Sequence, residues 1–199
     1  MGRLVETPAE IQGTLGRYAA FAGRLSPTAT VTGYDFLTDG ARAVATELGA
    51  PTTSPLLGDT WTRADLEGAL ANATDSVSIN AHADHTRFQP PAPSSAISRP
   101  APFTTAELGT TSLTNRLLFS MGCHSGLSVA DAMIASNLDW PQALGRAGSG
   151  AYAGNTTFGY GDTLEVAYSE ELNRLFAKFL KQGLNVGGAF PFAKNEYFA

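Results

Sequence analysis

The sequence predicts an α/β fold, namely a three-layer α/β/α sandwich with a mostly parallel sheet. Short apolar runs, several of them rich in β-branched residues, alternate with longer segments of helical periodicity; these runs lie at 28–33, 77–79, 117–119 and 150–154. Each run ends in small or polar residues, as strands do where they enter loops. Such alternation is typical of a parallel sheet that helices cover on both faces.

We expect three helices in the first half of the chain, at 7–23, 39–48 and 62–73. The run Thr7-Pro8-Ala9-Glu10 predicts the first, because it combines a capping residue, a proline suited to the first helical position and a glutamate three residues after the cap. Gly49 ends the second helix and Thr62 caps the third. A weaker strand is expected at 53–57.

The proline-rich segment 86–115 should be extended or looped, apart from one helical turn at 104–108. Four helices are expected after the strand at 117–119, namely 125–136, 140–147, 163–182 and 187–198. The helix at 163–182 has the clearest pattern, because its apolar side chains recur on one side.

The composition excludes several classes of function. The chain has 199 residues, of which 43% are hydrophobic and 16% charged, and its formal net charge is −5. One domain with a self-sufficient core fits these values. The negative charge and the lack of a Lys/Arg cluster argue against nucleic acid as a partner. No apolar run approaches the ~20 residues that cross a bilayer, so we expect no membrane span in this chain.

The single cysteine and all three histidines follow two of the predicted strands. Cys123 and His124 come after 117–119, and His82 and His85 come after 77–79. The carboxyl ends of parallel strands meet at one edge of a sheet, so we expect a thiol and an imidazole at the same edge. A thiol and an imidazole are the two catalytic groups that a cysteine hydrolase requires at minimum.

In this interpretation Cys123 is the nucleophile, and an imidazole takes its proton and later protonates the leaving amine. We favour His82 as this base, with His85 as the alternative. The backbone N–H groups of Cys123 and of Ala83, the residue after His82, would form the oxyanion hole. The start of the helix expected at 125–136 would favour the thiolate through its dipole.

Other interpretations of these residues stay open. A lone cysteine is often only a small buried hydrophobe. Donors suited to zinc are also present, at His82, Asp84, His85, Cys123 and His124. Because these donors lack the i, i+4 helical spacing of the common zinc hydrolase motif, we expect no metal ligands here. His124 should point away from Cys123 and shape the pocket.

The two strand-end motifs resemble those of the gingipain family of cysteine peptidases, relatives of clostripain and the caspases. That family has an apolar strand followed by His-Gly, then a loop, then an apolar strand followed by a small residue and Cys. The corresponding motifs here are Val77-Ser78-Ile79-Asn80-Ala81-His82-Ala83 and Leu117-Leu118-Phe119-Ser120-Met121-Gly122-Cys123. Segment 2–11 is similar to one that precedes the histidine strand in gingipain-type domains. Segment 152–163 looks like the loop after the strand that follows the cysteine.

The resemblance implies a caspase-like fold in which residues 1–199 form a single peptidase domain that lacks flanking parts at both ends. It implies that Cys123 and His82 form the catalytic dyad. By the same resemblance, Tyr160 or Phe158 walls the primary specificity pocket.

The Arg- and Lys-cleaving members of the family place an acidic residue at the floor of that pocket, from a segment upstream of the histidine. Asp39 or Asp35 lies in the corresponding region, although Asp39 also suits the N-cap of the helix at 39–48. The family's glycine after the histidine is Ala83 here, which restricts the backbone and narrows access.

The resemblance further implies a polypeptide substrate, a secreted or cell-surface location, and no cofactor, although it allows a structural calcium ion. Sheet edges left open by the missing flanks would be covered by flanking sequence or by a partner. We therefore expect a cysteine endopeptidase that acts through an acyl-enzyme. The alternatives are a non-catalytic caspase-like binding or scaffold module, which Ala83 would favour, and a zinc hydrolase.

Overall fold

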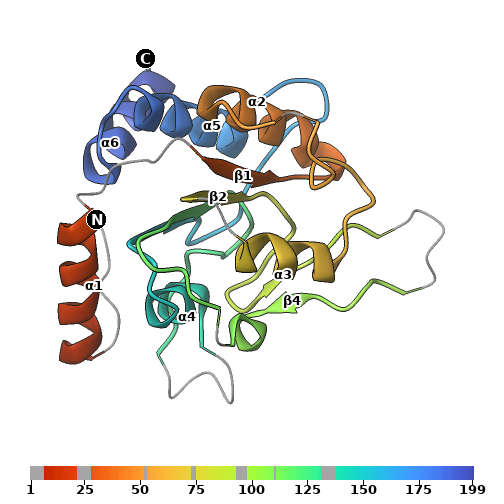
Figure 1. Cartoon of the computed structure of the whole chain (residues 1–199). Helices are drawn as coiled ribbons and strands as arrows, with labels where there is room; N and C mark the ends of the chain where they lie inside the picture. Colours follow the sequence, from red (N-terminus) through yellow and green to blue (C-terminus); the bar gives the residue numbers. More distant parts are fainter. Residues whose placement is uncertain are drawn as a thin grey trace.

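A computed structural model of the protein contains a four-stranded, all-parallel sheet between two layers of helices (Figure 1). The structure describes residues 7–21, 28–51, 53–72, 75–92, 98–109, 111–130 and 138–199, with only the backbone of Phe21. The strands lie in the order β1 (Ala29–Thr32), β2 (Ser76–Ile79), β5 (Leu117–Ser120) and β6 (Ala151–Gly154). Each neighbouring pair is parallel. The predicted fold class is confirmed.

One face of the sheet is covered by α2 (Thr38–Leu48), α5 (Tyr168–Lys181) and α6 (Val186–Tyr197) (Figure 1). The other face is covered by α3 (Arg63–Ala71), α4 (Trp140–Arg146), the 3-10 turn η2 (Thr105–Leu108) and the short antiparallel ribbon of β3 (Arg87–Phe88) and β4 (Phe103–Thr104). A second 3-10 turn, η1 (Asp35–Leu37), joins β1 to α2. Helix α1 (Pro8–Phe21) lies beside α4, where Arg17 Nη2 donates to Gly145 O at 2.7 Å.

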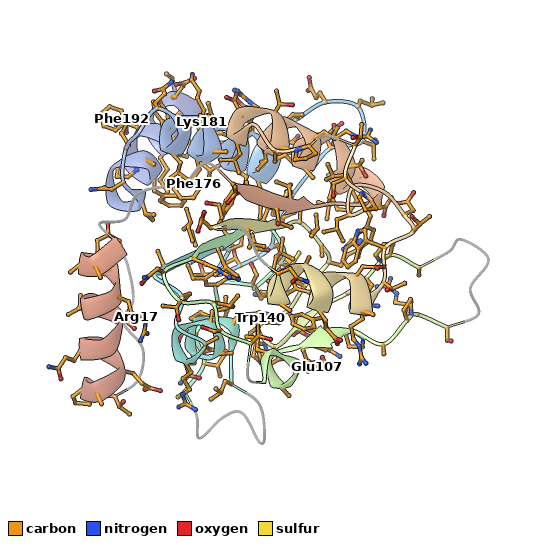
Figure 2. All side chains as sticks on the ribbon, in the orientation of Figure 1. Arg17, Glu107, Trp140, Phe176, Lys181 and Phe192 are labelled. Carbon is orange, nitrogen blue, oxygen red and sulfur yellow. The ribbon has the colours of Figure 1, made fainter. Side chains whose placement is uncertain are left out.

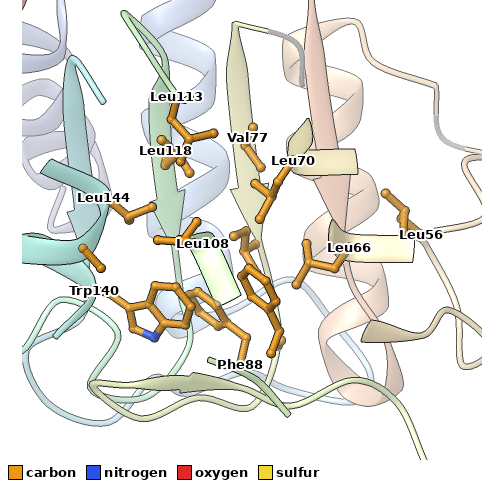
Figure 3. Close-up of a cluster of buried hydrophobic side chains, with 14 of the residues drawn as sticks. Leu56, Leu66, Leu70, Val77, Phe88, Leu108, Leu113, Leu118, Trp140 and Leu144 are labelled. Atoms are coloured by element: carbon orange, nitrogen blue, oxygen red, sulfur yellow. The ribbon is translucent and has the colours of Figure 1, made fainter. Parts of the chain in front are cut away.

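The strands divide their apolar side chains between two cores, because successive residues of a strand point to opposite faces. Val77 and Leu118 face the core that includes Trp140, whose ring stacks on Phe88 at a centroid distance of 4.3 Å (Figure 3). On the opposite face, Phe176 of α5 packs edge-on against Phe119 of β5 at 5.4 Å. Figure 2 shows Phe176 and Trp140 on opposite sides of the sheet. Burial on both faces holds the strand ends in fixed positions.

The strand expected at 53–57 is wrong. Leu57 makes only an isolated parallel bridge with Gly33, on the outer side of β1. The segment turns instead, because Leu57 N donates to Ser54 O at 2.9 Å and Leu56 N donates to Ser54 Oγ at 3.3 Å. A serine before Pro55 favours such a turn over an extended strand.

The helix expected at 125–136 is wrong for residues 125–130, and 131–136 lie outside the described residues. Backbone groups here bond to other segments: Gly126 N donates to Asn155 O at 2.8 Å, and Val129 N donates to Asp139 Oδ2 at 2.6 Å. No helix therefore begins at Ser125, and the dipole that we expected to favour the Cys123 thiolate is absent from this part of the chain.

The other predicted helices form, with shifted ends. The helix predicted from 163 begins at Tyr168, because an Asx-type turn, in which Leu164 N donates to Asp162 Oδ1 at 2.8 Å, occupies the preceding residues. Thr62 is the N-cap residue of α3, as predicted, and Asp65 completes a capping box with it. The predicted continuations to Gly23 and Ala73, and residues 2–6 of the segment likened to gingipains, lie outside the described residues. Among the helices that the structure describes, none is both long enough and apolar enough to span a bilayer.

Candidate active site

The loops that follow β2 and β5 lie against each other at the carboxyl edge of the sheet. Gly122 marks the contact, because a Cβ at this position would lie 2.7 Å from Ala81 O and 2.7 Å from the Ala83 side chain. Atoms do not approach this closely without a shift, so the position requires glycine. The contact brings Cys123 next to the segment that carries His82.

Buried polar bonds fix the end of β2. Asn80 is fully buried, and its Nδ2 donates to Thr32 O at 2.9 Å and to Ser78 Oγ at 3.0 Å. Its N–H donates to Thr32 Oγ1 at 3.1 Å. Hydrogen bonds in such a dry environment are strong and hold their partners rigidly. They set the direction in which the chain leaves the sheet toward His82.

The His82 imidazole faces the loop that follows β1. Its ring packs edge-on against Phe36 and Tyr34, at centroid distances of 5.5 and 5.8 Å, and its Nε2 lies 3.9 Å from Asp35 Oδ2. The Tyr34 hydroxyl accepts from His82 N at 3.4 Å and donates to Gln89 O at 2.8 Å. Burial raises the pKa of Tyr34 to about 12, so this hydroxyl keeps its proton. The aromatic rings and the carboxylate therefore orient the imidazole.

Asp35 has an unusual backbone conformation. Its φ is 56°, in the left-handed region that costs a non-glycine residue about 1 kcal/mol or more. Its N–H donates to Asp59 Oδ1 at 2.8 Å, which holds this conformation. The Asp59 carboxylate thus lies against the backbone of Asp35, whose own carboxylate is beside His82. From the sequence, Asp35 was a candidate only for the floor of the specificity pocket, and no pattern pointed to Asp59 as a site residue.

Cys123 belongs to a closely packed pair of loops. Its Sγ donates to Gly159 O at 3.6 Å, and a Cβ on Gly159 would lie 1.9 Å from Met121 O. Asn155 Nδ2 also donates to Met121 O, at 2.6 Å. The loop after β6 is therefore packed directly on the loop after β5, with the half-buried thiol at the contact.

Two backbone donors near the thiol have no acceptor among the residues that the structure describes. Within the described residues, no hydrogen bond is donated by the N–H of Cys123 or by that of Ala83. These are the two donors that the sequence assigned to an oxyanion hole, and the Gly122 contact brings their segments together. No hydrogen bond joins Cys123 Sγ to an imidazole nitrogen in the same part of the chain.

The other two histidines lie elsewhere in these loops. His124 has a φ of 53°, and its ring packs against Phe158 at a centroid distance of 4.8 Å. His85 lies in the turn closed by the bond from Asp84 N to Arg87 O, at 3.0 Å. Across the described ranges, no group of three or more His, Cys, Asp or Glu side chains has an arrangement that could hold a metal ion.

Phe158 and Tyr160 flank Gly159, the residue whose carbonyl accepts from the thiol. Their side chains are 59% and 62% exposed, and their ring centroids are 6.4 Å apart. Large apolar groups this exposed are available to contact a ligand. The chain therefore presents two largely exposed aromatic rings near Cys123.

Asp39 does not cap α2, which begins at Thr38 with Leu37 as the N-cap residue. Its Oδ1 accepts from Gly40 N at 2.8 Å, and its carboxylate lies near Glu170 of α5. Glu170 is fully buried, and its Oε2 accepts from Asp162 N at 3.0 Å. Burial, opposed by these N–H donors and assisted by the nearby negative charge of Asp39, raises the pKa of Glu170 to about 7.

Comparison with known proteins adds no relative to this description. No family model, curated protein or solved structure matches the chain.

Proposed function

We propose that this protein is a cysteine endopeptidase of caspase-like fold, with Cys123 as nucleophile and His82 as general base and acid. One observation carries the proposal. Gly122 packs so closely on Ala81 and Ala83 that a thiol, an imidazole-bearing loop and two backbone N–H groups with no acceptor in the described ranges lie at one edge of the sheet. Together they are the parts that acyl transfer needs.

The reaction proceeds in two halves. The Cys123 thiol gives its proton to His82 as its sulfur attacks the peptide carbonyl carbon, and the N–H groups of Cys123 and Ala83 stabilise the resulting oxyanion. The C–N bond then breaks, and His82 gives the proton to the leaving amine. A water molecule, deprotonated by His82, attacks the thioester and releases the carboxylic acid and the free thiol.

In this mechanism Asp35 is a positioning residue. Its carboxylate lies 3.9 Å from His82 Nε2 and would stabilise the imidazolium that forms during each half. The substrate peptide bond would lie between the imidazole and the thiol, so these two groups need no direct hydrogen bond before substrate binds. Catalytic hydrogen bonds often tighten only when the substrate is present.

Tyr160 and Phe158 support a substrate role for the loop after β6. They stand on either side of Gly159, whose carbonyl is 3.6 Å from the thiol, and both are more than half exposed. We propose that one of them contacts the side chain before the scissile bond, because that residue stays attached to Cys123 in the acyl-enzyme.

The test is a cleavage profile on a peptide library, read by mass spectrometry. Wild-type protein should release defined products, and Cys123→Ala should release none of them. His124→Ala removes an imidazole next to the nucleophile that has no part in the mechanism, and it should keep the same cleavage sites. His85→Ala separates the two candidate bases. Unchanged hydrolysis by Cys123→Ala would refute the proposal.

A non-catalytic binding module is the second candidate. The orientation of His82 toward Phe36 and Asp35, rather than toward the thiol, favours it. Such a module would bind library peptides in calorimetry and return them uncut, with equal affinity in wild type and in Cys123→Ala. Product formation by the wild type alone would exclude it.

A further inference from the structure

The loop after β6 ends against a buried carboxyl group of α5. Glu170 is fully buried, and its Oε2 accepts from Asp162 N at 3.0 Å and from Ala167 N at 3.4 Å. Its other oxygen, Oε1, is also buried and has no hydrogen-bond partner among the residues that the structure describes. A buried oxygen without a donor makes the ionised form costly. Glu170 therefore holds both ends of the segment 162–167, and its second oxygen favours a carboxyl group that carries a proton.

The residues between the thiol and Glu170 are held one after another. Gly159 O accepts from the thiol at 3.6 Å. Tyr160 N donates to Ser169 Oγ at 3.1 Å, and Tyr160 O accepts from Ser169 N at 3.0 Å. A Cβ on Gly161 would lie 2.9 Å from Glu170 Cδ, so the backbone lies directly on the carboxyl group. A shift at Glu170 is therefore transmitted along two peptide units to the carbonyl that contacts the thiol.

The same segment also contacts a ring that orients the imidazole. A Cβ on Gly161 would lie 2.9 Å from Phe36 Cδ2. The Phe36 ring packs edge-on against His82 at a centroid distance of 5.5 Å. Gly161 thus touches both Glu170 and Phe36, and movement of this segment would change a contact of the imidazole as well as a contact of the thiol.

A second carboxylate, that of Asp39 in α2, lies beside Glu170. The two helices are in close contact here, because a Cβ on Gly40 would lie 2.8 Å from Glu170 Cβ. Neither Asp39 nor Glu170 forms an ion pair with a basic residue in the described ranges. Two carboxylates this close share one proton, because their charged forms repel each other. The proton lets Glu170 donate to the Asp39 side chain.

Asp39 is the charged side chain that acts on the ionisation of Glu170. Burial, followed by the negative charge of Asp39 and its hydrogen bond, raises the pKa of Glu170 to about 7 against the effect of the two N–H donors. The proton is therefore retained to near-neutral pH. The other charged side chains on the elements packed here pair with one another, bond to other groups or are exposed; they are Asp35 of η1, Arg42 and Glu47 of α2, Asp162 and Glu165 of the loop, and Glu171 and Arg174 of α5.

We propose that Glu170 is a positioning residue for both proposed catalytic groups. A proton that it shares with Asp39 keeps the segment 159–162 packed on the thiol loop and on Phe36. Loss of this proton leaves two like charges in a buried place and loosens the segment. The proposal rests on the peptidase function proposed above, because it names what holds the reacting groups of that site in place.

Hydrogen exchange of the whole protein, read by mass spectrometry, tests the anchor. In wild type, the protection of amides in 159–167 relative to an unstructured chain should fall about tenfold per pH unit between about pH 5 and 7. The reason is that the packed loop binds a proton that the opened loop releases.

Matched variants identify the group that titrates. Glu170→Gln can still donate to Asp39 and accept from the two N–H groups, and Asp39→Asn can donate to an ionised Glu170. Both should remove most of the pH dependence. Glu165→Gln removes an exposed carboxylate of the same loop and should retain it. These conservative variants decide the question even if a harsher substitution does not fold.

Alkylation of Cys123 by iodoacetamide tests whether the anchor reaches the thiol. Glu170→Ala removes the carboxyl group and should speed the reaction about fivefold, because Gly159 O no longer holds the thiol. Glu170→Gln should restore the wild-type rate. Protection of 159–167 that does not depend on pH in wild type, or equal alkylation rates in the alanine and glutamine variants, would overturn the proposal. Neither measurement requires hydrolysis, so failure of the peptidase function would be seen separately, in the cleavage profile.

Discussion

The two halves of the candidate site are built differently, although both lie at the carboxyl edge of one sheet. On the Cys123 side, the loops after β5 and β6 are packed without space for a methyl group, as at Gly159 and Met121. On the His82 side, the loops after β1 and β2 enclose a cavity of about 820 Å³ with two carboxylates in its wall. One half is dense and the other is open.

In the proposed mechanism, this difference would let one parallel sheet supply both a rigid nucleophile and an open path for the substrate. Dense packing fixes the thiol and the two backbone N–H groups proposed as oxyanion donors, whose placement would decide whether charge is stabilised as it develops. Open space beside the imidazole would give the substrate access to it. Each of the following changes affects one half and should leave the other intact.

The largest expected effect comes from His82→Ala on the open side. Peptide hydrolysis should fall about 10³-fold, because general acid–base catalysis typically contributes 10²–10⁴-fold. The free energy of unfolding should change little, since this side chain is partly exposed. Steady-state kinetics and urea unfolding check the two statements. If His82→Ala kept more than a tenth of wild-type kcat/KM, another residue would be the general base.

On the dense side, Gly159→Ala should destabilise the fold by about 3 kcal/mol, because its Cβ would lie 1.9 Å from Met121 O. Gly68→Ala is the matched control. It lies in α3, where a new Cβ would have no described atom within 4 Å apart from its chain neighbours and its own helix backbone, and it should stabilise the fold by up to ~1 kcal/mol. Urea unfolding measures both. Equal stability of the two variants would show that the loops at Gly159 can shift to accommodate a methyl group at little cost.

Glu170 makes stability depend on pH through the loop that follows Tyr160. Its pKa is raised from 4.5 to about 7 by burial, so the folded state binds more protons between these values. The free energy of unfolding should therefore fall as pH rises from about 4.5 to 7, by on the order of 2 kcal/mol. Glu170→Gln should remove most of this fall, whereas Glu165→Gln on the exposed loop should retain it. Thermal unfolding at several pH values distinguishes them.

The smallest expected effect is that of Tyr34→Phe on the open side. It removes the hydroxyl that accepts from His82 N and donates to Gln89 O, and should cost about 1 kcal/mol of stability. The rate of hydrolysis should fall severalfold, because the His82 imidazole would be held less firmly. The change in kcat should be larger than the change in KM. Tyr18→Phe in α1 is the control. Identical kinetics in Tyr34→Phe and wild type would assign the hydroxyl to stability alone.

The features of the fold that depend on local sequence pattern could be predicted from the sequence. Strand runs such as 117–119 and the Thr62 cap carry their own signals, and the order of strands and helices predicted the parallel sheet. Residues 125–130 were wrongly expected to be helical. Their backbone groups bond to Asn155 and Asp139, and a periodic pattern in the sequence does not reveal such tertiary hydrogen bonds.

The candidate site divides in the same way. Cys123 and His82 could be placed at one edge from strand ends alone. The glycine contact at Gly122 and the pairing of Asp35 with Asp59 could not, because they join segments far apart in the sequence. The sequence likewise gave no reason to place Asp39 beside Glu170 rather than at a helix cap.

The central claim is that Cys123 and His82 act together on a peptide carbonyl. The most direct measurement is mass-spectrometric mapping of adducts after treatment with a peptide that carries a carbonyl-type electrophile, in wild type and in His82→Ala. We predict one adduct, on Cys123, that forms at least tenfold more slowly in His82→Ala, while a small non-peptide alkylating agent reveals the same accessible thiol in both. Equal rates of peptide adduct formation in the two proteins, or no adduct on Cys123 in the wild type, would contradict the claim.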